Sequence, residues 1–185
     1  MYRLLLLGMI LSGGSLWSQA ATESVKTSGQ KSLQQVFTAP VFAAYQENSD
    51  LKIQELFFYL QQLSQTSLEA SLRNEMEIAC LALFVNDSTL VVDVTSTTPT
   101  LIPIKTLFQK LAQTAPLQLT VSERVNYNSV TYQSWKNGYT VRCIQNEATR
   151  DYTVAQTVFF QLQPQQFGSH EQQTYQYRLG NMELR

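Results

Sequence analysis

The first half of the chain carries apolar residues at helical spacing in two stretches. Between 50 and 63 they recur every three or four positions, behind the polar pair Ser49 and Asp50, which suits a helix N-cap. The second stretch follows Thr66, which opens a capping-box sequence, and one apolar face then continues for more than four turns. The pattern therefore predicts two helices, over 50–63 and 66–84.

A short strand and a third helix are predicted next. Residues 89–94 are rich in β-branched side chains, which favour a strand. After a Ser/Thr/Pro loop, Pro103 lies where the first turn of a helix accepts proline. The apolar face of that helix would consist of Ile104, Leu107, Phe108 and Leu111.

After Pro116 the period of the pattern changes from 3.6 residues to 2. Apolar and polar residues alternate over 117–127, which predicts a strand with one buried face and one face in water. The pair Asn137–Gly138 tolerates the positive φ angles of a tight hairpin turn. We therefore expect a hairpin with strands over 130–135 and 139–145.

The C-terminal part predicts two more long strands, over 154–162 and 174–184. A loop rich in Pro, Gly and Ser, at 164–169, separates them. Helices first and antiparallel strands afterwards predict an α+β fold, in which N-terminal helices pack against a curved antiparallel sheet.

The N-terminus has the pattern of a secretory leader. Arg3 gives a cationic start, an apolar run extends from Leu4 to Leu11, and Ser18-Gln19-Ala20 is a small-x-small cleavage signal. We therefore expect a signal peptide at 1–20 and a periplasmic or secreted protein with no membrane span after cleavage. The alternative is an uncleaved anchor, although the apolar run is shorter than the roughly 20 residues that cross a bilayer.

The residues that follow the leader divide into two parts. The stretch 21–32 has almost nothing to bury, so it is expected to be a flexible lead-in. The remaining 33–185 has the size of one ordinary domain, and we expect a single α+β domain there.

Charge and cysteine content narrow the classes of function. The formal net charge is −1, so the chain has no excess of positive charge to attract the phosphates of a nucleic acid, and we expect no nucleic-acid partner. Cys80 and Cys143 are an even pair, which would permit a disulfide in an exported protein. Both lie in apolar or strand-like runs, which favours two buried free thiols. With one histidine and no paired-cysteine spacing, we expect neither a metal site nor a cofactor.

Three segments carry a resemblance to a known family: residues 73–93 (RNEMEIACLALFVNDSTLVVD), 104–111 (IKTLFQKL) and 135–142 (WKNGYTVR). In element order and apolar spacing, over about 50–185, the chain resembles the nuclear transport factor 2-like superfamily, in particular its small secreted bacterial members. The resemblance implies that the sheet and helices form a cone. The open end of such a cone is either a pocket for small molecules, sometimes catalytic, or a closed core in members that only bind partners.

The sequence contains few groups that indicate catalysis. It has no nucleophile elbow, phosphate-binding loop, zinc-protease helix or dinucleotide fingerprint, and His170 falls in a Gly/Ser/Gln loop typical of solvated residues. Glu123 shares its phase with Val121 and Val125, which would turn its carboxylate toward the core and raise its pKa. The alternative is a β-bulge that turns Glu123 outward. Asp93 is a weaker candidate of the same kind.

Aromatic residues gather on the predicted strands. Three of them, Tyr127, Trp135 and Tyr139, are with Glu123 the candidate ligand-binding residues. Their alternative role is core and cross-strand packing.

The sequence therefore favours an exported, non-catalytic domain that binds an unknown protein partner, or forms a homodimer, through its sheet. The alternative is a small-molecule-binding protein, or an enzyme of the lyase or isomerase type, with a cone pocket that reaches Glu123. The two hypotheses differ in whether a solvent-connected cavity reaches that carboxylate.

Overall fold

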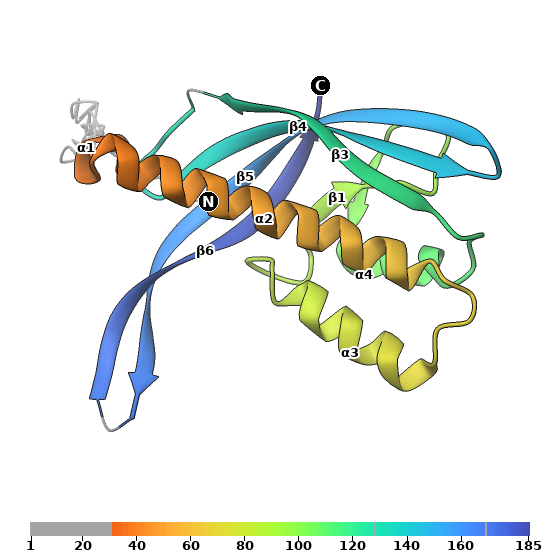
Figure 1. The fold of residues 1–185 in the computed structure, drawn as a ribbon, viewed down its shortest axis with the longest axis horizontal. Helices are drawn as coiled ribbons and strands as arrows, with labels where there is room; N and C mark the ends of the chain where they lie inside the picture. The colour runs from red at the N-terminus through yellow and green to blue at the C-terminus, as the bar shows by residue number, and fades with distance from the viewer. Residues whose placement is uncertain (1–30, 128, 169) are drawn as a thin grey trace, which may run out of the picture.

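The computed structural model describes residues 31–127, 129–168 and 170–185, and shows four helices ahead of a curled antiparallel sheet (Figure 1). The predicted signal peptide and most of the predicted lead-in lie outside the described residues. The helices are α1 (Leu33–Val36), α2 (Ala39–Leu63), α3 (Ala70–Leu81) and α4 (Ile104–Leu111). The predicted α+β fold is confirmed.

The main sheet has the strand order β3-β4-β5-β6, with every neighbouring pair antiparallel. Its strands are β3 (Gln118–Tyr127), β4 (Ser134–Gln145), β5 (Ala148–Phe167) and β6 (His170–Leu184). Two short strands, β1 (Leu90–Val92) and β2 (Leu101–Pro103), form a separate antiparallel pair. The four long strands curl into a half-barrel, and α2 runs along the opening (Figure 1).

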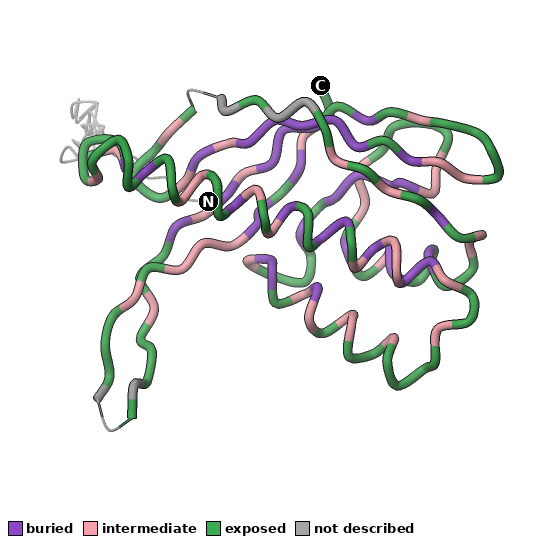
Figure 2. The backbone as a smooth tube through the Cα atoms, in the orientation of Figure 1, coloured by how far each residue is buried: buried purple, intermediate pink, exposed green. Residues whose placement is uncertain are grey.

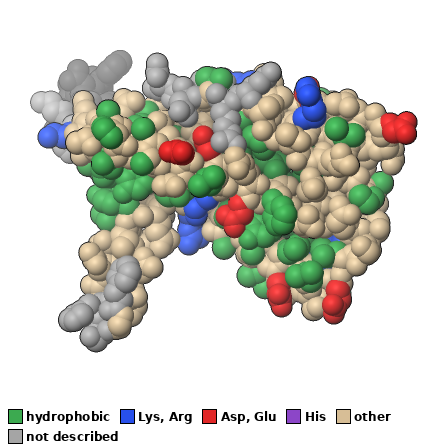
Figure 3. Space-filling model, in the orientation of Figure 1, with side chains coloured by type: hydrophobic (Ala, Val, Ile, Leu, Met, Phe, Trp, Pro, Cys, Tyr) green, Lys and Arg blue, Asp and Glu red, His purple; other side chains and the backbone are tan. Residues whose placement is uncertain are grey.

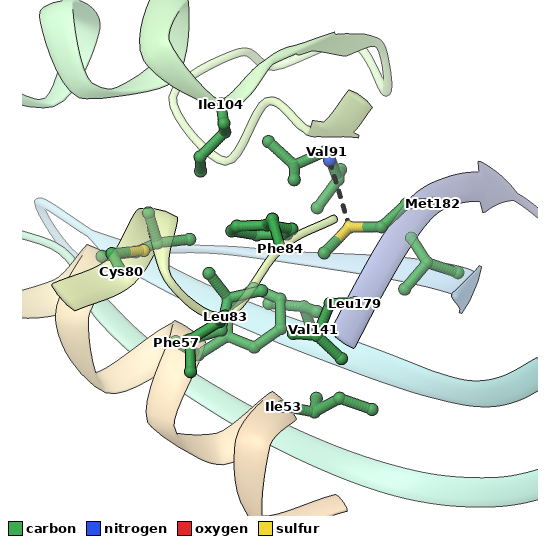
Figure 4. Packing of buried hydrophobic residues seen from close by; sticks show 14 of the residues in the cluster. Ile53, Phe57, Cys80, Leu83, Phe84, Val91, Ile104, Val141, Leu179 and Met182 are labelled. Carbon is green, nitrogen blue, oxygen red and sulfur yellow. Dashed lines mark hydrogen bonds between the residues drawn. The ribbon is translucent and has the colours of Figure 1, made fainter. Parts of the chain in front are cut away.

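The core lies between α2 and the sheet. Phe57 from α2 and Leu179 from β6 lie on either side of Leu83 and Phe84, which follow α3 (Figure 4). All four side chains are at least 95% buried. Burying a side chain of this size stabilises the fold by about 1.5–3 kcal/mol. The apolar face of α2 therefore fixes the helix across the sheet.

Helix α2 is longer than the spacing alone predicts. It begins at Ala39 with Pro40 in its first turn, so Ser49 and Asp50 lie in its middle and the predicted N-cap is wrong. Proline suits the first turn of a helix because the missing N–H has no partner there. The second predicted helix is confirmed only in its centre, since α3 runs from Ala70 to Leu81 and its N-cap is Glu69 rather than Thr66.

The predicted hairpin turn at Asn137–Gly138 is wrong. Both residues lie inside β4, where Asn137 pairs with Gln156 and Gly138 with Ala155 of β5. The turn that joins β4 to β5 is Asn146–Glu147, whose φ angles are +47° and +67°. Two consecutive positive φ angles are the geometry of the two-residue hairpin turn, so the prediction identified the right chemistry at the wrong asparagine.

Several other predictions are confirmed. Helix α4 begins directly after Pro103, and the strand predicted at 117–127 is β3. Cys80 and Cys143 are both buried and free. Burial raises the pKa of each thiol, which makes both of them unreactive. Within the part of the chain that the structure describes, no helix is long and apolar enough to span a membrane.

The outer part of β5 and β6 extends beyond the rest of the sheet. Strand β4 begins opposite Phe159, so residues 161–167 of β5 and 170–176 of β6 pair only with each other. We call this two-stranded extension the arm. It leaves the body beside the N-terminal end of α2, and its described side chains are mostly exposed (Figure 2). The loop predicted at 164–169 is wrong, because β5 continues to Phe167.

Candidate binding site

The candidate residues on β3 lie where that strand is irregular. The register with β4 shifts between Ser122 and Val125, so one extra residue of β3 is accommodated there, as in a β-bulge. Val125, expected on the core side, is 53% exposed. Strict alternation over 117–127 is therefore wrong. The side chains of Glu123 and Tyr127 lie outside the described residues.

The candidates on β4 are core residues. Trp135 is fully buried, with ring centroids of Phe42, Phe160 and Tyr177 at 5.7, 6.1 and 6.5 Å. Tyr139 is buried against Phe57 of α2. Neither side chain lines any of the three pockets considered below. Their role in ligand binding stays a prediction.

Buried polar groups tie the sheet to itself and to α2. The Tyr139 hydroxyl donates to Oε1 of Gln156 at 2.6 Å, and Nε2 of Gln156 donates to the Gly180 carbonyl at 3.2 Å. Burial, and then the charge of Asp50, raise the pKa of Tyr139 well above its ordinary value, so the hydroxyl remains a donor. Asn137 donates to Ser49 Oγ at 2.8 Å, which joins β4 to the middle of α2. These contacts position strands rather than a substrate.

Asp93, the weaker carboxylate candidate, is held in an ion pair. Its side chain is 1% exposed, and Oδ2 lies 2.6 Å from Nζ of Lys110 on α4. Oδ1 accepts hydrogen bonds from the backbone N–H and the hydroxyl of Thr95. Burial acts to raise the pKa of Asp93, but the hydrogen bonds from Lys110 and Thr95 outweigh it and the pKa is lowered. A carboxylate in this environment joins α4 to the β1–β2 loop, and its lowered pKa makes it a weak base.

An aromatic cluster at the base of the arm was only partly visible in the sequence. Phe37, which follows α1, contacts the rings of Phe160 and Tyr175 at 5.4 and 5.5 Å. Phe160 stacks on Tyr175 with a centroid distance of 4.6 Å and an interplanar angle of 13°. Tyr45 of α2 packs edge-on to Phe160 at 4.8 Å. The cluster joins α1, α2 and the arm.

A pocket of about 510 Å³ opens beside this cluster. We call it the arm groove; it is lined by Leu33, Val36, Phe37, Tyr132, Gln133, Phe160, Gln161, Leu162 and Tyr175. Three of the lining side chains, Val36, Tyr132 and Leu162, are 45–54% exposed. Figure 3 shows hydrophobic side chains gathered where the arm leaves the body, beside α1. The groove is therefore accessible, and its lining combines these apolar side chains with the polar Gln133 and Gln161.

The two faces of the arm differ in composition. Cross-strand pairs place Phe160 beside Tyr177 and Leu162 beside Tyr175 on the face toward the groove. The opposite face carries polar side chains throughout its described part: Gln163, Gln165, Gln172, Thr174 and Gln176, together with Gln161, which also lines the groove at the base of the arm. The alternation Phe160-Gln161-Leu162-Gln163 is the sequence signal for this arrangement. Phe37 could not be placed without knowing where the chain turns before α2.

Two further pockets lie elsewhere. One of about 350 Å³ lies between α2 and β3, beside Phe58 and Leu119, and one of about 330 Å³ lies between α3 and α4, beside Leu81 and Phe108. No group of three or more metal-ligating His, Cys, Asp or Glu side chains occurs among the residues that the structure describes. The side chain of His170 lies outside them.

Comparison with protein families, curated proteins and solved structures found no significant match. The structure shows an α+β fold with a curled four-stranded sheet, and the resemblance to the nuclear transport factor 2-like superfamily stays a prediction.

Proposed function

We propose that this protein is an exported, non-catalytic binding domain that holds a polypeptide partner in the arm groove. The observation that carries the proposal is the groove itself, in which apolar side chains from four separate segments converge and several remain about half exposed. Exposed apolar side chains that gather in one groove indicate an interaction site more often than ones that are scattered singly. The proposal keeps the binding role expected from the sequence and moves it to the base of the arm.

The chemistry of the lining selects the kind of ligand. None of the nine lining residues is an acid, a base, a cysteine or a histidine. An ionic ligand would lose its hydration there without gaining a charged partner. Apart from the phenols of Tyr132 and Tyr175, the same lining offers no group to move a proton, and no acid–base pair is available in the groove. Phe37, Phe160 and Tyr175 provide rigid aromatic walls that suit an aliphatic or aromatic side chain.

The shape of the surface favours a polypeptide over a small molecule. Exposed apolar side chains line the groove from α1, the segment before β4 and the arm: Val36, Tyr132 and Leu162. An extended segment of a partner that follows the groove, whose volume is about 510 Å³, would cover all three.

Site-specific photo-cross-linking in the native compartment tests the proposal. A photoreactive residue at Leu162 is expected to form an adduct with another polypeptide, because this side chain faces the groove. The matched control is the same residue at Gln165, which lies on the opposite face of the arm three positions along the same strand. Equal adducts at both positions, or no polypeptide adduct at Leu162, would overturn the proposal. An adduct of twice the mass of the chain identifies a second copy.

A further inference from the structure

The strand register decides which backbone groups of the arm face outward. The N–H of Phe160 donates to the Gln133 carbonyl at 2.6 Å, away from β6, and the N–H of Leu179 donates to the Leu83 carbonyl at 2.8 Å, away from β5. Alternate residues of an antiparallel pair point their N–H and C=O groups in the same direction. The backbone N–H and C=O groups that face the outer edge of β6 are therefore those of Glu171, Gln173, Tyr175 and Tyr177.

The two outer edges of the arm are not equivalent. On β5 the outward positions include Pro164, which pairs with Gln173 and has no N–H to donate. On β6 every one of the four residues that face outward between Glu171 and Tyr177 has a backbone N–H to donate. In the described part of the chain, no backbone hydrogen bond reaches these four residues from outside the sheet, and the segment 83–85 covers the edge only at Leu179.

The arm lacks the support that a two-stranded ribbon usually needs. An isolated hairpin is only marginally stable in water, and three or more strands or a covering element are required. Here the base of one face rests on Phe37, while the tip and the Gln/Thr face have no cover. Pairing along the open β6 edge would supply the missing strands.

We propose that this edge pairs antiparallel with the same edge of a second copy of the chain, with Gln173 at the two-fold axis. The inference rests on the proposed binding role and names the partner for one edge of the arm. In this register Glu171 lies opposite Tyr175 of the second copy, and about six backbone hydrogen bonds form. The turn of the second copy then ends before the segment 83–85, which already occupies the edge at Leu179.

The composition of the arm makes it complementary to itself. Seven of its residues are glutamines, whose side-chain amide is both donor and acceptor. In the proposed register Gln173 lies opposite its own copy and Gln172 lies opposite Thr174, so each pair can exchange a hydrogen bond, whereas paired charges of one sign would repel. Apart from His170 and the phenol of Tyr175, the one ionisable side chain in the arm sequence is Glu171, and the proposed register places it away from its own copy. Antiparallel pairing is two-fold symmetric, as a closed dimer requires.

The pairing has a consequence for the groove. Tyr175 lies on the groove face of β6, and pairing the two β6 strands joins both arms into one four-stranded sheet. The grooves of the two copies then open on the same face of that sheet, so the dimer presents two binding sites side by side.

Two substitutions at one position test the pairing in the full chain, with Gln166 of β5 as the matched control. Gln173→Pro removes an outward N–H and leaves the bonds between β5 and β6 intact; Gln166→Pro does the same on the edge that Pro164 already interrupts. By sedimentation, we expect the native chain and Gln166→Pro to be dimers and Gln173→Pro to be a monomer. Under oxidation, Gln173→Cys should form an intermolecular disulfide, because directly paired Cα atoms lie about 5.5 Å apart.

The cysteine variants keep the test decisive if a proline disturbs the arm. Gln166→Cys is expected to stay unlinked, since the two β5 strands would lie about 14 Å apart across the joined sheet and the two copies of this residue are also offset along them. A monomeric native chain, or equal cross-linking at both positions, would overturn the pairing. Photo-cross-linking from Leu162 reports on the groove independently, so a dimer without a groove partner, or a groove partner without a dimer, shows which proposal has failed.

Discussion

The body and the arm are built from the same two strands, yet they obey different physical constraints. In the body, Val154 and Val158 of β5 are fully buried under α2, with β4 on one side and β6 on the other. In the arm, a few residues further along the same strand, Leu162 is 54% exposed and only β6 is beside it. The length of β5 therefore depends on its pairing with β6, whereas the stability of each part of β5 depends on whether other elements cover it.

The comparison also separates two uses of aromatic residues. Trp135 and Tyr139 are buried in the body, where their rings fill space between α2 and the sheet. Tyr132 and Tyr175 lie at the groove and are partly exposed. Aromatic content alone therefore does not locate a binding surface, and exposure decides which rings are available to a partner.

The largest expected effect is a loss of stability in the body. Trp135→Ala should lower the free energy of unfolding by about 3–5 kcal/mol, because it leaves a cavity among Phe42, Phe160 and Tyr177. Denaturant titration measures the change. Tyr132→Ala, at a 45% exposed position near the arm, is the control and should change it by less than about 0.5 kcal/mol. Equal losses of unfolding free energy in the two variants would contradict the distinction between buried and exposed aromatic residues.

A smaller effect tests the ion pair of the body. Asp93→Asn should destabilise the protein by about 1 kcal/mol at pH 7. The neutral amide cannot form the ion pair with Lys110, and it accepts a weaker hydrogen bond from Thr95. The pKa of Asp93 is lowered in the fold, so its contribution is present above the unfolded pKa and is lost as the pH falls through the folded value. The stability difference between the two proteins should therefore disappear in acid.

The control for this measurement is Asp87→Asn. Asp87 also pairs with a lysine, Lys105, and this pair lowers the pKa of Asp87, but both side chains are more than half exposed. Water screens an exposed pair, so no measurable change in stability is expected. If Asp87→Asn cost as much as Asp93→Asn, burial would not be the reason for the effect at Asp93.

The smallest expected effect lies in the arm. Leu162→Ser should change the free energy of unfolding by less than about 0.5 kcal/mol, because this side chain is already half exposed. Val158→Ser, four residues earlier on the same strand, should cost at least about 2 kcal/mol because it puts a hydroxyl into the core. Leu162→Ser should nevertheless weaken partner binding in a pull-down with the cross-linked partner. A large loss of stability in this variant would show that the arm belongs to the core.

The parts of the fold that local pattern determines could be predicted from the sequence. The Pro103 start of α4 and the alternation that opens β3 are signals within a few residues, and both are confirmed. The sequence predicts a hairpin turn at Asn137–Gly138 because Asn-Gly tolerates positive φ, whereas the positive φ angles occur at Asn146–Glu147. Only the pairing of β4 along its whole length with β5 decides between them.

The candidate site was harder to predict, because its residues come from distant parts of the chain. Phe37 and Tyr175 are more than a hundred positions apart, and their contact depends on where α2 begins. The sequence indicated an aromatic cluster on the sheet but not which rings stay exposed. Leu162 is exposed because β4 does not extend beside it: the first residue of β4 lies opposite Phe159. This depends on how the strands pair and not on the residues next to Leu162 in the sequence.

Pro164 has a consequence for how far assembly can proceed. A glutamine-rich, nearly uncharged ribbon with two open edges would template new strands on both sides, which is the geometry of fibre growth. One missing N–H in the middle of the β5 edge interrupts that side at every copy. A second copy that pairs along β6 leaves only the two β5 edges on the outside, and each of these is interrupted at Pro164. Further strands therefore do not add, and the complex stays finite.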